Sequence, residues 1–303
     1  MSELPAKITI QFIVFSFVVL FIALSCNVKA APLVIGTISS DPVEELRKYT
    51  PFAKYLSQRL RGDGVDDVTV AIATDVQQMA GMLRKGTVDL FIDSSVTASI
   101  VNQMAGSQFL LRRWKKGRDK YRSVIFTTAN SEIRGIEDLR GKVIAFEEPF
   151  STSGFVLPAL ILLQSGLALS PMDNVRAKPD DTSVGYLMAY DNETQFTWLE
   201  RGRVAAAAMA EKDYEEYAKN ALMPMRVLQV TPYVPYHVVV NRSDLDKALV
   251  QRIKNILQKA HKDTAGAEIL RNFEKTTRFD EIPQDLLNEV QKLMPFVGKV
   301  AAL

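Results

Sequence analysis

The chain has 303 residues, the length of about two domains, and its 37 Lys+Arg against 35 Asp+Glu leave it almost neutral. This balance, with 47% hydrophobic residues, excludes a disordered chain or one that coats nucleic acid. Fifteen Gly, thirteen Pro and 24% charged residues are ordinary for a globular protein and exclude a collagenous one.

The first 30 residues are predicted to be a signal peptide. An uncharged apolar run, residues 8–24, follows Lys7 and is short for a relaxed membrane span, and small residues stand where signal peptidase would cut after Ala30. Two alternatives stay open, an uncleaved N-terminal anchor and a lipoprotein acylated at Cys26. The mature chain would contain no cysteine, which excludes thiol catalysis and cysteine-ligated metal sites.

From Leu33 onward, short apolar runs alternate with amphipathic ones. The pattern predicts strands at 33–37, 68–73 and 88–92. The helices between and after them are predicted at about 42–61, 76–85 and 95–104. Strand, helix and strand at this spacing imply right-handed crossovers and a parallel sheet.

A second alternating set follows. Strands are predicted at 121–128, 143–146, 204–208, 225–230 and 237–241, and helices at 136–139, from 153 to about 166, at 194–201, 213–221, 245–262 and 283–296. No flexible linker separates the halves, so the chain is expected to cross between two α/β lobes on paired extended segments, 121–128 and 233–241. The first lobe would comprise residues 31–122 plus 236–303, and the second lobe residues 123–235.

The segment 147–158, Glu-Glu-Pro-Phe-Ser-Thr-Ser-Gly-Phe-Val-Leu-Pro, carries the clearest chemistry. Pro158 has no amide hydrogen, so the apolar helix that contains it must begin near Ser153 or Gly154. Three hydroxyls and several free N–H groups then converge at one helix N-terminus, which favours an anion site. An ordinary Ser/Thr cap is the alternative, and the local sequence does not choose between them.

These residues resemble the phosphate-, phosphite- and phosphonate-binding periplasmic proteins of ABC importers, a branch of the type 2 periplasmic binding proteins. The likeness extends from about Leu33 to Phe273 and includes residues 49–56, 73–75, 85–89, 121–124 and 136–142. It implies an α/β fold of two lobes with a ligand cleft between them. It also implies an exported protein that captures a small oxyanion for the permease of an ABC importer. A periplasmic sensor that signals to a membrane kinase or cyclase is the alternative.

The resemblance also assigns candidate ligand-binding residues. Ser151, Thr152 and Ser153 match the family's oxyanion-binding loop, and Tyr121 matches its hinge-side tyrosine. The other candidates occupy positions that face the cleft in the family: Ser39 and Ser40 after the first strand, Ser94 and Ser95 where Gly-Pro or Gly-Asn is usual, Asn192 at the place of a ligand-facing histidine, and His237.

Two positions bear on selectivity. Lys212 and His237 stand about where relatives that bind aminophosphonates carry acids, although a one-residue shift would restore Glu211. A ligand ammonium group left unpaired in a closed cleft is costly, so an amine-bearing phosphonate is expected to be disfavoured.

Other chemistry has little support. His237 and His261 show no zinc-binding spacing, and no nucleophile motif or nucleotide-binding loop is present, so we expect no metal, no cofactor and no enzymatic activity. The basic stretch 112–122 is interpreted as a solvated turn beside the hinge that could also attract anions, and no nucleic acid partner is expected behind a signal peptide.

Overall fold

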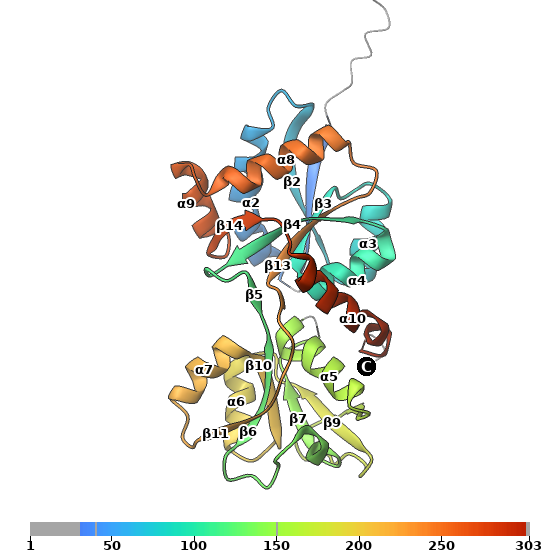
Figure 1. Ribbon diagram of the computed structural model, residues 1–303, viewed down its shortest axis with the longest axis vertical. Helices are drawn as coiled ribbons and strands as arrows, with labels where there is room; N and C mark the ends of the chain where they lie inside the picture. Colours follow the sequence, from blue (N-terminus) through green and yellow to red (C-terminus); the bar gives the residue numbers. More distant parts are fainter. Residues whose placement is uncertain (1–30, 40, 150, 301–303) are drawn as a thin grey trace, which may run out of the picture.

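The computed structural model describes residues 31–39, 41–149 and 151–300, so the expected signal peptide and Ser40 lie outside the described residues. The described chain forms two α/β lobes, drawn one above the other in Figure 1. No helix within these ranges is long and apolar enough to span a membrane.

The first lobe is built on a mixed six-stranded sheet with the order β14-β4-β13-β3-β1-β2. Its strands are β1 (Ala31–Ile38), β2 (Val65–Ala73), β3 (Leu90–Ser94), β4 (Gln108–Lys115), β13 (His237–Asn241) and β14 (Thr276–Asp280). Its helices are α2 (Pro42–Arg59), α3 (Val76–Arg84), α4 (Ser95–Ala105), α8 (Lys247–Ala260) and α9 (Thr264–Asn272). β1 pairs in parallel with β2 and β3, which confirms the predicted parallel start, whereas the pairs β3–β13, β13–β4 and β4–β14 are antiparallel.

The second lobe holds another six-stranded sheet, with the order β11-β6-β10-β7-β9-β8. Its strands are β6 (Ser123–Thr128), β7 (Val143–Phe146), β8 (Ala168–Pro171), β9 (Ser183–Met188), β10 (Ala206–Ala210) and β11 (Met225–Val230). Its helical segments are a 3₁₀ turn (Ile136–Leu139), a π-helical turn (Thr152–Val156), α5 (Leu157–Gln164), α6 (Asn192–Glu200) and α7 (Glu211–Lys219).

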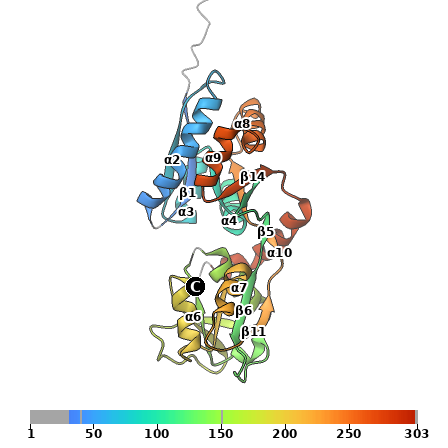
Figure 2. The same ribbon diagram turned by 90° about the vertical axis from the view of Figure 1, so that its left-hand side faces the viewer.

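The chain passes between the lobes on two extended segments that pair, as predicted. β5 (Lys120–Tyr121) lies antiparallel to β12 (Val234–Pro235), with Tyr121 opposite Val234. The two segments run side by side from one lobe to the other in Figures 1 and 2.

The C-terminal helix α10 (Gln284–Val300) contacts both lobes. Its Val290, Leu293 and Val297 belong to one buried cluster that also contains Val96 of α4 and Leu160 of α5. Helix α5 is apolar around its whole circumference, which a helix can be only when it is buried on all sides. This burial fixes the position of its N-terminal end, which faces the gap between the lobes.

The basic stretch 112–122 is only partly the solvated turn expected from the sequence. Arg112 and Arg113 lie within β4 and are buried, and only the residues that follow Lys115 form the turn. Arg112 is neutralised by Asp119 at 2.8 Å and Asp280 at 2.9 Å. A buried strand can contain consecutive arginines only when carboxylates compensate them in this way.

Candidate ligand-binding site

A cavity of about 390 Å³ separates the two lobes next to the crossing segments. Both lobes contribute polar side chains to it, and Tyr121 and Tyr236 close it on the hinge side with their rings stacked at 4.4 Å. The charged and hydroxyl-bearing lining includes Ser39, Glu45, Lys48, Asp93, Ser94, Lys115, Glu147, Glu148, Ser151, Thr152, Ser153, Asp213, His237 and Glu274.

The loop 151–153 begins the helical segment that continues into α5. Ser151 is its N-cap: the Ser151 hydroxyl accepts from the Gly154 amide at 2.9 Å and donates to Glu147 at 2.5 Å. A β-carbon at Gly154 would overlap the Glu147 side chain, so glycine is required for this close approach. The amides of Thr152 and Ser153 are the first two of the helix and have no intrahelical acceptor, which leaves them for an anion.

Thr152 joins this loop to the opposite lobe. Its side chain is 4% exposed, and its hydroxyl donates to the Ser94 hydroxyl at 2.6 Å. Ser94 ends β3 and in turn donates to Thr97 at 2.8 Å, while Tyr121 also hydrogen-bonds with Thr152. The loop therefore lies where strand β3, the hinge and helix α5 meet.

The acids of the cavity outnumber its available cations. Within the described chain, Asp93, Glu147, Glu148 and Asp213 form no ion pair, whereas Lys48 is paired with Glu45 at 3.2 Å. Burial raises the pKa of Asp93 to about 7, and burial also raises the pKa of Glu147 even though Ser151 donates to it. Burial is the main cause of both shifts, and a cationic group placed beside these carboxylates would favour their ionised form.

Arg113 lies behind the cavity and shares one carboxylate, that of Glu274, with Lys115. Its side chain is fully buried, and Nη2 donates to Glu274 at 2.6 Å and to Nδ1 of His237 at 2.7 Å. Lys115 donates to the same Glu274 at 2.8 Å. Burial and the adjacent Arg113 lower the pKa of His237 well below its usual range, so this imidazole is neutral.

Most of the described residues singled out from the sequence line this cavity: Ser39, Ser94, Tyr121, Ser151, Thr152, Ser153 and His237. Ser95 and Asn192 are not among the lining residues. Ser95 is fully buried as the first residue of α4. Asn192 lies at the start of α6, where its side-chain amide is 3.5 Å from Asp213.

Lys212 is not where the sequence argument placed it. Its ammonium pairs with Glu216 at 3.2 Å on its own helix, and the next residue, Asp213, lines the cavity. Glu211, the alternative acid, is also absent from the lining because it pairs with Arg122 and Tyr233. Sequence reasoning missed Asp213, Asp93 and Glu274; only the Glu147-Glu148 pair, directly before the hydroxyls, gave a local signal.

The sequence matches, over residues 35–287, the family described as ABC transporter, phosphonate, periplasmic substrate-binding protein. XAC2383 from Xanthomonas citri is similar in structure and sequence: the chloride-bound form has a TM-score of 0.80 and 28% identity, covering 89% of this chain and 99% of that one. The ATP-bound form has a TM-score of 0.80 and 27% identity, with coverages of 89% and 98%.

PhnD1 from Prochlorococcus marinus, in complex with methylphosphonate, shares the fold at 17% identity and a TM-score of 0.63, covering 90% of this chain and 100% of that one. The two lobes therefore have the type 2 periplasmic binding protein fold. Because the family match spans most of the chain, the protein belongs to the periplasmic phosphonate-binding proteins, the substrate-binding components of ABC transporters.

Proposed function

We propose that this protein captures a small phosphonate that also carries a cationic group, and delivers it to the permease of an ABC importer. The observation that carries the proposal is the composition of the cleft. Two free amides and neighbouring hydroxyls lie in the same cavity as four carboxylates that have no cationic partner among the described residues.

The oxyanion end of the ligand binds at Thr152 and Ser153. The N–H groups at the start of a helix and the positive end of its dipole favour a negative group, and each hydrogen bond to a charged oxygen is stronger than one to a neutral acceptor. XAC2383, at 27% identity, is bound to ATP, whose phosphates are phosphorus oxyanions of the same kind.

The cationic end lies against Asp213 and Glu147. A bare oxyanion would enter a cavity that already contains uncompensated acids, and like charges repel strongly where water is excluded. An ammonium group between the oxyanion and these acids offsets that repulsion. The expectation that an amine is disfavoured rested on Lys212 and His237, but Lys212 lies outside the lining and His237 is neutral.

Calorimetry with methylphosphonate and 2-aminoethylphosphonate tests the proposal. The amine-bearing compound is expected to bind more tightly. Thr152→Val removes the hydroxyl that holds the loop and its amides against Ser94, and is expected to weaken both compounds by up to about tenfold, the equivalent of one hydrogen bond. Asp213→Asn should reduce the preference for the amine, whereas Asp66→Asn, which removes an exposed charge on β2, should not change it.

Tighter binding of methylphosphonate would overturn the assignment of a cationic end. Unchanged affinity of both compounds for the Thr152→Val protein would contradict the role of the Thr152 hydroxyl in holding the oxyanion loop in place.

A further inference from the structure

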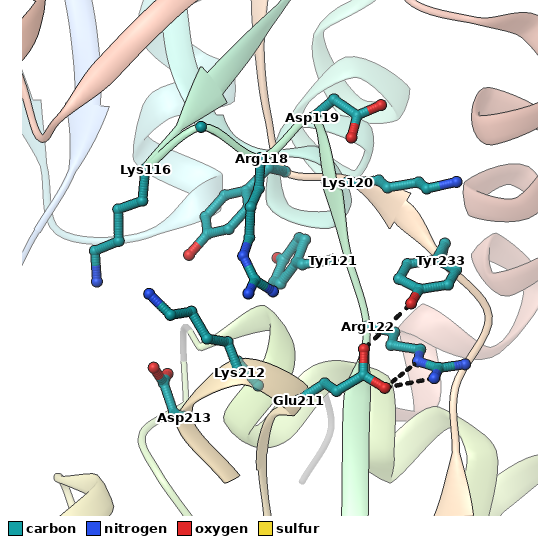
Figure 3. Close-up of a pocket in the computed structure, with 13 residues that line it drawn as sticks. Lys116, Arg118, Asp119, Lys120, Tyr121, Arg122, Glu211, Lys212, Asp213 and Tyr233 are labelled. Carbon is teal, nitrogen blue, oxygen red and sulfur yellow. Dashed lines mark hydrogen bonds and ion pairs between the residues drawn. The ribbon is translucent and has the colours of Figure 1, made fainter. Parts of the chain in front are cut away.

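A second cavity, of about 230 Å³, lies at the hinge beside the ligand cleft (Figure 3). Residues 116–119, the turn between β4 and β5, line it from the first lobe, and the start of α7 lines it from the second. Tyr233 and Tyr236 of the crossing segment complete the wall. The two lobes therefore meet in this cavity as they do in the cleft.

Some of the charged groups in this cavity are already neutralised or directed elsewhere. Arg122 donates through Nε to Glu211 at 2.8 Å, and the Tyr233 hydroxyl donates to the same carboxylate at 3.2 Å. Asp119 pairs with Arg112 at 2.8 Å. Lys120 points away from the other cations in Figure 3, and its ammonium lies over the Tyr233 ring at 4.9 Å.

The remaining cations, Lys116, Arg118 and Lys212, point into a common space (Figure 3). No carboxylate in the described ranges forms an ion pair with Lys116 or Arg118. The partner of Lys212, Glu216, has a side chain that is 61% exposed, and such a surface pair within one helix is weak. Three like charges from two lobes thus converge, and no described carboxylate forms an ion pair with more than one of them. An anion placed between them would relieve their repulsion.

This cluster of three cations is continuous with the ligand cleft. Tyr121, Ala210, Asp213 and Tyr236 line both cavities. Asp213 is therefore at their junction: it follows Lys212 in sequence, and it lines the cleft together with the oxyanion loop of the same lobe. The order of charge preferences is an anion at Thr152 and Ser153, a cation at Asp213, and a second anion at Lys116, Arg118 and Lys212.

We propose that Lys116, Arg118 and Lys212 form a second anion subsite that binds a carboxylate of the ligand, which makes the ligand an amino acid with a phosphonate or phosphate group at its far end. In an α-amino acid the ammonium and the carboxylate are attached to one carbon. The ammonium would then lie at Asp213 while the carboxylate reaches the three cations next to it. The inference rests on the proposed function and adds the third charged group. Because two of the cations belong to one lobe and the third to the other, the carboxylate also favours closure of the lobes.

Calorimetry with 2-aminoethylphosphonate and 2-amino-3-phosphonopropionate, which differ by one carboxylate, tests the inference. The wild-type protein is expected to bind the amino acid about tenfold more tightly, as one charge-assisted contact would give. Arg118→Gln should remove most of this advantage and leave the affinity for 2-aminoethylphosphonate within about twofold. Lys120→Gln removes the same charge two residues away, at the start of β5, where the side chain points elsewhere, and should preserve the advantage.

Equal or weaker binding of the amino acid overturns the inference, as does an Arg118→Gln protein in which both ligands are weakened alike. In either case, binding of 2-aminoethylphosphonate that still depends on Thr152 and Asp213 would leave the proposed function intact. No binding of either compound overturns both. Thermal melting of each variant checks that it is folded, and Lys116→Gln provides a second substitution in the same cluster.

Discussion

The charge network behind the cleft makes a quantitative prediction for Glu274→Gln. Arg113 is fully buried, and Glu274 is its only anionic partner in the described structure, at 2.6 Å. The guanidinium also lies over the Phe273 ring at 4.6 Å and donates to the neutral His237. Glutamine preserves the shape of the side chain but leaves Arg113 and Lys115 without a counter-charge.

Removing one partner of a buried ion pair destabilises a protein by roughly 3 to 5 kcal/mol. The Glu274 side chain is 15% exposed, so water compensates part of the loss, and we expect about 3 kcal/mol at pH 7. Burial opposes ionisation of Glu274, but Arg113 and Lys115 hold its pKa well below the usual 4.5. Its contribution to stability is therefore present above pH 4.5 and is lost as the pH falls toward the lowered value.

Urea unfolding of both proteins at pH 7 and at lower pH measures this contribution. The difference in unfolding free energy should be largest at pH 7 and shrink on acidification. Glu281→Gln is the matched control, because Glu281 pairs with Lys254 at 2.9 Å but is 65% exposed, and its loss should be below about 1 kcal/mol. If Glu274→Gln costs no more than this control, the charge of Arg113 is compensated in some other way and the reasoning is refuted.

Three further predictions follow from the same structure. Asp93→Asn should stabilise the ligand-free protein by at most about 4 kcal/mol at pH 8 and should not stabilise it at pH 4. The pKa of Asp93 is raised in the folded protein, so the wild-type protein loses stability as the pH rises from 3.8 to about 7. Urea denaturation of both proteins across this pH range measures the difference. Gly154→Ala should weaken methylphosphonate binding in calorimetry because the new methyl group overlaps Glu147. The control protein, Gly81→Ala, places its methyl group in open space on α3; it should bind methylphosphonate normally and be more stable by about 0.4 to 1 kcal/mol. Leu293→Ala should lower the unfolding free energy in urea by about 2 to 5 kcal/mol, and a loss below 1 kcal/mol would contradict the packing of α10.

The sequence predicted the elements whose signals are local. The strands that became β1, β2 and β3 were visible as apolar runs, and caps and glycines located the helices between them. Strand β4 was missed because Arg112 and Arg113 resemble a solvated segment unless their partners are known. One partner of Arg112, Asp119, is close in sequence, but Asp280 and Glu274 lie about 160 residues later in the chain, and no local pattern connects them with the arginines.

The candidate site likewise combines features that the local sequence predicts with features that depend on distant segments. The hydroxyl loop at 151–153 was predictable because a helix start is determined by its own neighbours, Pro158 included. Whether a carboxylate is paired depends on distant segments. Asp93 lies near the end of β3 in the first lobe and Asp213 lies in the first turn of α7 in the second. Only the folded arrangement shows that both line one cavity and that neither forms an ion pair among the described residues.

Helix α10 restricts the path by which a ligand enters. It rests on α4 in one lobe and α5 in the other, and it also contacts β12 of the crossing segment. Separating the lobes on this side would expose Val290, Leu293 and Val297, at roughly 1.5 to 3 kcal/mol for each large side chain. Separation on the side away from α10 would leave these side chains buried, so we expect the ligand to enter from that side.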